Sequence, residues 1–288
     1  MGRRRNARRS FDKYIIGSYI LIALYTIFAL APVYWMISTS FKSPLDTRKL
    51  KVFPFIDFNP VTKTWEDVLF GDKAEMTIKA LKNGLIVGAS SAVLCTALSS
   101  LAGYGLAKFR YRRWKNRDIA SFILAQRMMP PAVVALPIFI FFSTLNLIDT
   151  PISLILIETA VNMPLIIWIL MDFFRGVPNE IEDAAYIDGL TIFQTFYKIS
   201  LRLAAPGIAV ALVLSFILSW NEFFFVLVLA YSEAITVPWL VSLGYSQISL
   251  EYWTISAYGT LSIIPPIILA FFIQKYIIRG LTFGAVKG

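Results

Sequence analysis

The sequence contains no histidine and a single cysteine, Cys95, which lies inside an apolar run. These absences exclude Cys/His zinc sites, nucleophilic Ser–His or Cys–His pairs and intrachain disulfides, and leave only carboxylate chemistry for an enzyme. Charged residues are also scarce: they make up 16% of the 288 residues, whereas 57% are hydrophobic. Because a single water-soluble core cannot bury so much apolar surface, the chain is expected to use lipid as its solvent.

The net charge is +9 at neutral pH. In a soluble protein this excess would suggest nucleic acid as a partner. Here the basic residues flank apolar runs, where they orient a chain in the membrane. We therefore predict contact with membrane lipid and no nucleic-acid partner.

About six segments are long and apolar enough to cross a bilayer as helices, each needing about 20 residues. They predict an all-α integral membrane protein, and the expected spans are residues 14–36, 84–107, 119–145, 151–171, 204–231 and 252–274. An Arg-rich start followed by Ala29-Leu30-Ala31 imitates a signal peptide, but the apolar run continues to Met36, which favours an uncleaved anchor.

Six spans place both termini on one side of the membrane. Of the 27 Lys and Arg residues, 18 fall on that side: in a basic arm (1–13), in the 108–117 connection, in the 175–202 region and in the tail. Eight more lie in the 38–83 segment, whose interspersed acidic residues predict a small folded element on the other side. The positive-inside rule therefore predicts cytoplasmic termini and an external 38–83 element, within a transmembrane domain over 14–288.

A polar island, residues 178–206, separates the fourth and fifth spans. Pro178 can open a helix whose first turns are acidic, Asp188-Gly189 predicts a turn, and Thr191 with Gln194 predicts a capping box for a second, amphipathic helix. We expect two short helices that meet at a corner. Their apolar surface needs a cover from lipid, from the protein itself or from a partner.

The island resembles the cytoplasmic coupling loop of ABC importer permeases. That family carries Glu-Ala-Ala, three residues, Gly, and then about nine residues to an apolar residue before Leu-Pro. Asp183-Ala184-Ala185, Gly189 and Leu201 stand in register here. The chain departs from the pattern with Asp at 183, Leu at 190 and Arg at 202. The Arg leaves open how the second helix enters the membrane.

Further segments look like the MalG-type permeases of carbohydrate importers, and the resemblance covers nearly the whole chain. They are Arg127-Met128-Met129-Pro130-Pro131, Asn146-Leu147-Ile148-Asp149-Thr150, Trp220-Asn221-Glu222-Phe223-Phe224 and the tail 280–288. The resemblance implies the type I permease fold of ABC importers, an inner-membrane location and an ATPase-coupling loop at 178–203. Its coupling residues would be Glu182, Asp183, Ala184, Ala185, Asp188 and Gly189.

No phosphate-binding loop of the type G-x-x-x-x-G-K-S/T occurs in the sequence, so ATP is expected to bind to another chain. The resemblance implies two ATPase subunits, a second permease subunit and an extracytoplasmic solute-binding protein, with ATP and Mg²⁺ on the ATPase. We expect no cofactor, metal or catalytic residue in this chain itself.

Several polar residues inside the spans are candidates for the substrate pathway, because an ionisable group at bilayer depth costs about 2.5–3.5 kcal/mol or more. They are Arg127, Glu158, Asn162, Asn221 and Glu222. Arg127 is either part of a gate or an arginine that reaches the interface. Glu158 and Asn162 share one helix face and either line a cavity or pack against a neighbouring helix, and Asn221 with Glu222 either form structural hydrogen bonds or contact solute.

The stretch 234–250 has no charge but is short for a span, which suggests an external re-entrant or interfacial segment. By resemblance it corresponds to a loop that reaches the solute-binding protein, with Tyr245, Ser246 and Gln247 as candidate contacts. The sequence thus predicts a permease subunit of an ATP-driven importer for a sugar or related solute. The alternative is an ion-coupled secondary carrier that uses Arg127, Glu158 and Glu222 as a relay.

Overall fold

The computed structural model describes residues 2–244 and 250–285. These residues form helices joined by turns and loops, and an isolated bridge links Pro54 and Phe58. Four helices are long and apolar enough to cross a membrane, and two bent helix pairs bring the number of candidate spans in the described residues to as many as six. The predicted fold class is confirmed. The chain divides into two compact units, residues 1–74 with 241–261 and residues 75–240 with 262–288.

The first unit contains α1 (Gly2–Ser40), η1 (Asp46–Arg48), α2 (Lys63–Leu69) and the start of α13 (Tyr252–Ala285). Residues 2–13 of the predicted basic arm are helical and belong to α1. Lys42 follows α1 with its ammonium 3.9 Å from the centre of the Trp35 ring, and burial lowers the pKa of Lys42 although Asp46 and Asp57 attract its charge. Lys73 pairs with Glu251 at 2.9 Å, which joins the 38–74 segment to the turn before α13.

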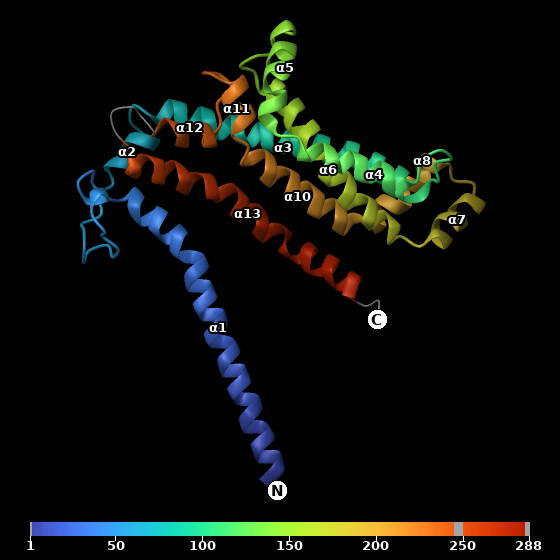
Figure 1. Ribbon diagram of the computed structural model, residues 1–288, viewed down its shortest axis with the longest axis horizontal. Helices are drawn as coiled ribbons and strands as arrows, with labels where there is room; N and C mark the ends of the chain where they lie inside the picture. The colour runs from blue at the N-terminus through green and yellow to red at the C-terminus, as the bar shows by residue number, and fades with distance from the viewer. Residues whose placement is uncertain (1, 245–249, 286–288) are drawn as a thin grey trace. The chain divides into compact units, whose positions relative to one another are not determined.

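The second unit is built around α3 (Ala74–Lys108), α6 (Pro151–Arg175) and α10 (Ala205–Trp220), which run alongside one another (Figure 1). Glycines allow their close approach: a Cβ on Gly84 would lie 2.9 Å from the Trp220 ring, and one on Gly103 would lie 3.0 Å from the Met171 nitrogen. Small residues at helix contacts are typical of membrane proteins, where lipid supplies no hydrophobic drive between helices. Trp220 also donates to the Ser262 carbonyl at 2.8 Å, which ties α10 to α13.

Two predicted spans are not single helices. The third consists of α4 (Asn116–Ala125) with η2 (Gln126–Met128), followed by α5 (Pro131–Thr144) at an angle of 87°. Pro130 and Pro131 cause the break, since proline cannot continue a preceding helix and fits its own first turn. The fifth ends at Trp220, and helix resumes only as α11 (Phe224–Leu229). The predicted spans 119–145 and 204–231 are therefore each interrupted within their length.

Two helical boundaries also differ from the predictions. The second span begins at Ala74, ten residues before the predicted start at 84, so the end of the predicted external element belongs to α3. Within the 234–250 stretch the described part forms α12 (Val237–Leu243). The candidate contacts Tyr245, Ser246 and Gln247 lie outside the described residues.

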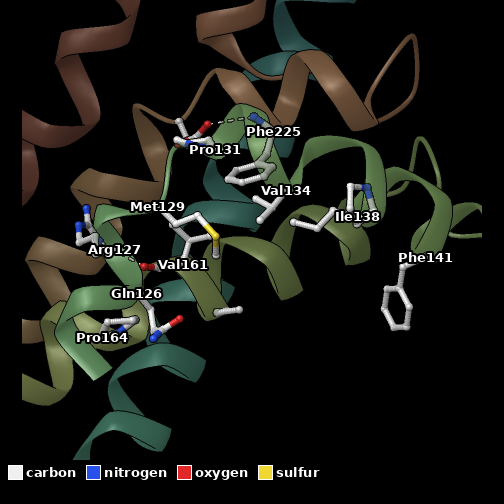
Figure 2. A pocket seen from close by; sticks show the side chains of 13 residues that line it. Gln126, Arg127, Met129, Pro131, Val134, Ile138, Phe141, Val161, Pro164 and Phe225 are labelled. Carbon is white, nitrogen blue, oxygen red and sulfur yellow. Dashed lines mark hydrogen bonds between the residues drawn. The ribbon is translucent and has the colours of Figure 1, made fainter. Parts of the chain in front are cut away.

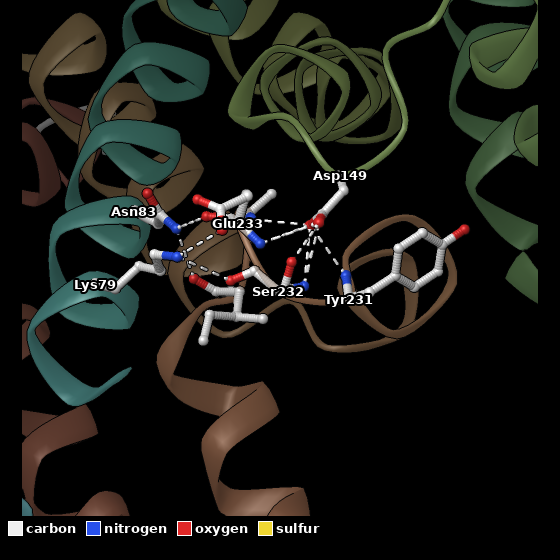
Figure 3. Close-up of polar contacts among 8 residues, drawn as sticks. Lys79, Asn83, Asp149, Tyr231, Ser232 and Glu233 are labelled. Atoms are coloured by element: carbon white, nitrogen blue, oxygen red, sulfur yellow. Dashed lines mark hydrogen bonds and ion pairs between the residues drawn. The ribbon is translucent and has the colours of Figure 1, made fainter. Parts of the chain in front are cut away.

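Asp149 anchors the connection between α11 and α12 (Figure 3). Its carboxylate accepts hydrogen bonds of 3.0 Å from the backbone N–H groups of Tyr231, Glu233 and Ala234 and from the Ser232 hydroxyl. Partial burial raises the pKa of Asp149, but the hydrogen bonds to its carboxylate lower it by more. The resulting pKa is about 2. Asp149 adopts a positive φ of 59°, which directs its side chain into this cradle.

The opposite side of the same connection is fixed by α3. Lys79 pairs with Glu233 at 2.8 Å, and the Asn83 amide donates to the carbonyls of Glu233 and Ile235 at 2.6 and 3.0 Å (Figure 3). The α5–α6 turn and α3 thus hold one loop between them. This clamp fixes the end of the second unit at which α6 begins.

Replacement of Asp149 by Asn should lower the free energy of unfolding by about 2 kcal/mol, because several donors lose a charged acceptor. The folded-state pKa lies below the value of about 3.9 for an unfolded Asp, so the stabilisation is complete above pH 4 and is lost as the pH falls towards 2. Thermal unfolding of the detergent-purified chain between pH 6 and 2.5 checks both points. Equal pH dependence of the parent and D149N would contradict them.

Candidate functional site

The polar island forms a helical elbow, residues 178–203, between α6 and α10. It contains α7 (Asn179–Ile187), α8 (Ile192–Thr195), the π-helical turn η3 (Phe196–Ser200) and α9 (Leu201–Leu203). Pro178 precedes the first residue of α7, as predicted. The predicted second helix exists but contains a π turn, and it joins α10 at a bend of 80°.

The corner of the elbow has the turn chemistry that the sequence predicts. Gly189 adopts a φ of +84°, a conformation that strongly favours glycine. Thr191 accepts a hydrogen bond from the Gln194 N–H at 3.3 Å, and the Gln194 side chain accepts one from the Thr191 N–H at 3.0 Å. The predicted capping box is therefore confirmed, and it fixes the direction in which α8 leaves the corner.

The outer surface of the elbow combines apolar and charged side chains. Ile187 and Phe193 are 87% and 68% exposed, and Tyr197 is exposed beside them in sequence. Among the predicted coupling residues, Asp183, Ala184, Asp188 and Gly189 are also exposed. An exposed apolar group next to carboxylates at a chain corner is typical of a surface that a partner covers.

Two predicted coupling residues face inward instead. Ala185 is buried, and Glu182 is only 4% exposed. Glu182 lies 3.2 Å from the Lys108 ammonium, and its other oxygen accepts a hydrogen bond from Ser200 at 2.5 Å. Glu182 therefore holds α7 against its neighbours and does not belong to the outer surface.

Lys108 and Ser200 were not predicted as site residues. Lys108 is the last residue of α3, and besides Glu182 it donates to the Val177 carbonyl at 2.7 Å and to the Asn179 side chain at 2.9 Å. In the sequence Lys108 belongs to the run of basic residues at 108–117, which indicates the orientation of the chain in the membrane. Nothing local distinguishes it from its neighbours.

A second feature is a cavity of 540 Å³ beside the break between η2 and α5 (Figure 2). Its wall is mostly apolar, and its polar lining consists of Gln126, Arg127 and Glu222. Arg127 donates to the Val161 carbonyl and to the Asn162 side chain of α6, both at 3.3 Å. The proline break thus directs Arg127 across to α6 at the edge of the cavity (Figure 2).

The other predicted pathway residues lie in different surroundings. Asn162 is buried and donates to Ser219 of α10 at 3.1 Å, and Ser219 is hydrogen-bonded to Ser91 of α3 at 2.9 Å. Glu158 is also buried, 2% exposed, and does not line this cavity. Asn162 therefore belongs to a polar contact that runs through α6, α10 and α3.

Asn221 and Glu222 form local hydrogen bonds after α10. The Asn221 amide donates to the Ile217 carbonyl at 2.8 Å, and Glu222 accepts from the Phe225 N–H at 3.0 Å. Glu222 also lines the cavity, whereas Asn221 does not. Of the five predicted pathway residues, the structure brings Arg127 and Glu222 to one cavity.

The chain matches the family described as "Binding-protein-dependent transport system inner membrane component" over residues 98–283. It is 32% identical to the trehalose transport system permease protein SugB of Mycobacterium tuberculosis, over 93% of this chain and 96% of that protein. It is 31% identical to the trehalose/maltose transport system permease protein MalG of Thermococcus litoralis, over 95% of this chain and 96% of that one.

Among solved structures, the fold resembles a chain of a bacterial ABC transporter involved in the import of the acidic polysaccharide alginate. The TM-score is 0.71 at 23% identity, and the match covers 93% of this chain and 98% of the other. At this identity the likeness shows the fold alone, which agrees with the type I permease fold that the sequence resemblance implied.

Replacement of Gly189 by Val should destabilise the elbow by about 1–2 kcal/mol, because a β-branched residue is strained at positive φ. A Cβ there would meet no atom within 4 Å, so the cost is conformational and not steric. Gly189→Asn is the matched control, since Asn tolerates this conformation. Hydrogen exchange of the 179–195 amides should be faster in G189V than in G189N, and equal rates would contradict the prediction.

Proposed function

Because the chain belongs to the family of inner membrane components of binding-protein-dependent transport systems, we propose that it translocates a sugar or related solute as a permease subunit of an ABC importer. The sugar assignment rests on relatives that are named for trehalose and maltose transport. The elbow carries the mechanistic part of the proposal, because an exposed apolar corner on a membrane protein needs a partner in water.

The partner of the elbow is an ATPase subunit. This sequence has no phosphate-binding loop, so ATP is hydrolysed on the ATPase subunit. The resulting movement reaches the permease through the contact at the elbow. Two ATPase subunits with ATP and Mg²⁺, a second permease subunit and an extracytoplasmic solute-binding protein complete the importer. The elbow, and with it both termini, lies on the cytoplasmic side of the inner membrane.

Asp183, Ala184, Asp188 and Gly189 form the joint with the ATPase. The two carboxylates supply charge at the corner, the small side chain of Ala184 lets a partner approach closely, and Gly189 gives the corner its angle. Glu182 and Ala185 support the joint from inside. Closure of the ATPase dimer moves the elbow, and the attached α6 and α10 change access to the transport pathway.

The cavity beside Arg127 is the part of the pathway that this chain contributes. Arg127, Gln126 and Glu222 offer donors and acceptors for hydroxyl groups, and the apolar wall fits the C–H faces of a sugar ring. Glu158 and Asn162 act behind this wall. Asn221 is exposed and stands at the end of α10.

Replacement of Ile187 by Glu tests the docking surface. Ile187 is the most exposed apolar residue of the elbow, so a charge there should reduce the amount of ATPase that copurifies with the chain at least tenfold without changing the melting temperature. Leu50→Glu is the matched control, because Leu50 is 84% exposed but belongs to the predicted external element. Full copurification with I187E would contradict docking at the elbow.

Replacement of Arg127 by Met tests the pathway. Loss of a charged hydrogen-bond donor should cost about 1.5–3 kcal/mol of solute interaction and lower ATP-driven uptake roughly ten- to hundredfold, with ATPase copurification unchanged. Uptake of radiolabelled trehalose, maltose and glucose by proteoliposomes measures this, with Arg175→Met as the control. Uptake by R127M equal to the parent would remove the cavity from the pathway, and uptake driven by an ion gradient without ATP would favour a secondary carrier.

A further inference from the structure

The elbow is attached to α3 as well as to the two helices that it connects in sequence. Lys108, the last residue of α3, and Glu182 of α7 form an ion pair whose side chains are only 7% and 5% exposed. The Lys108 ammonium also reaches the Val177 carbonyl and the Asn179 side chain. Three acceptors, one just before the elbow and two in its first helix, therefore surround the Lys108 ammonium of α3.

An aromatic contact joins α3 to the other half of the elbow. Tyr104 lies one turn before Lys108, and its ring centre is 4.9 Å from that of Phe196 in η3 and 5.4 Å from that of Phe174 at the end of α6. All three rings are buried. This contact is independent of the ion pair and involves a different segment of the elbow.

Ser200 connects the two halves of the elbow to each other. It is fully buried, and its hydroxyl donates to the same Glu182 carboxylate that pairs with Lys108. A displacement of α7 relative to η3 would break this bond inside a buried site, where an unpaired charge is costly. The elbow and the end of α3 thus form one tightly connected block.

We propose that Lys108 and Glu182 are positioning residues that transmit the displacement of the elbow to α3, so that α3 moves with it as a third connected helix. The idea rests on the proposed docking of an ATPase at the elbow. A stiff helix carries a displacement along its length, and 26 residues at 1.5 Å each place Lys82 about 40 Å from Lys108 along α3. ATP-driven movement of the elbow therefore reaches the far end of α3.

The experiment uses the complex of the chain with its ATPase and second permease in nanodiscs. Replacement of Cys95 by Ser removes the single cysteine, and Lys82→Cys then places one reporter thiol on the exposed side of α3. The rate of maleimide labelling is measured without nucleotide and with ATP plus vanadate. With the ion pair intact, the two rates should differ at least threefold.

The test variant replaces Lys108 and Glu182 together by Met. Removal of both partners leaves no unpaired buried charge, so the complex should keep its melting temperature and its ATPase, whereas the nucleotide-dependent change in labelling should fall to less than half. The control replaces the exposed pair Asp172 and Arg175, 60% and 43% exposed, by Asn and Met and should keep the change. Glu182→Gln alone, which still accepts the Ser200 hydrogen bond, should reduce the change and serves if the double variant does not fold.

If the pair has only a structural role, the double variant should keep both the stability and the labelling change of the parent complex. That result would overturn the inference while leaving the proposed function intact. Absence of the labelling change in the complex with the intact pair would overturn it as well. If a stable double variant no longer copurified with the ATPase, Glu182 would be a docking residue, and the inference that it transmits movement to α3 would be wrong. Failure of the ATPase to copurify with the parent chain would instead contradict the proposed function.

Discussion

A buried ion pair determines how the elbow is held. The Lys108 ammonium is removed from water at the end of α3, where Glu182, the Val177 carbonyl and the Asn179 side chain replace its hydration. A buried charge without such partners would cost several kcal/mol, so the position of α7 follows from that of α3. Because Glu182 also accepts from Ser200, the same carboxylate sets the position of the second half of the elbow. The exposed corner around Gly189 is thus presented by a rigid support, which is what a surface that receives force requires.

The membrane-spanning helices are held together by close packing and by hydrogen bonds within the protein. Lipid cannot satisfy backbone hydrogen bonds, so helices are required, and their contacts depend on small residues such as Gly84 and Gly103 that let α3 approach α10 and α6. The helices are interrupted next to charged side chains. One break is at Pro130, near Arg127, and the other follows Trp220, next to Glu222. Both interruptions border the cavity, and there the freed backbone and polar side chains find partners within the protein. At one end of the second unit, the Asp149 carboxylate accepts hydrogen bonds from the N–H groups of the loop between α11 and α12 and so fixes that loop.

Local features could be predicted from the sequence, and long-range ones could not. Helical spans follow from apolar length, and the turn at Gly189 and the capping box of Thr191 depend on residues a few positions apart. The double proline indicates an interruption of the helix, but its 87° angle does not follow from the sequence, since the angle depends on packing of α5 against α11. The pairing of Lys108 with Glu182 has no local signal, because many basic residues compete for each carboxylate. For that reason the burial of Glu182, one of the predicted coupling residues, could not be foreseen from the sequence.

The proposed function depends on contact between the elbow and a nucleotide-hydrolysing subunit. The most direct measurement is site-specific photo-crosslinking in intact cells, with a photoreactive amino acid in place of Phe193, which is 68% exposed on the elbow, followed by mass spectrometry of the adduct. Docking at the elbow predicts a crosslink to a separate protein that contains a phosphate-binding loop. A crosslink to an extracytoplasmic protein, or an adduct with lipid alone, would contradict it.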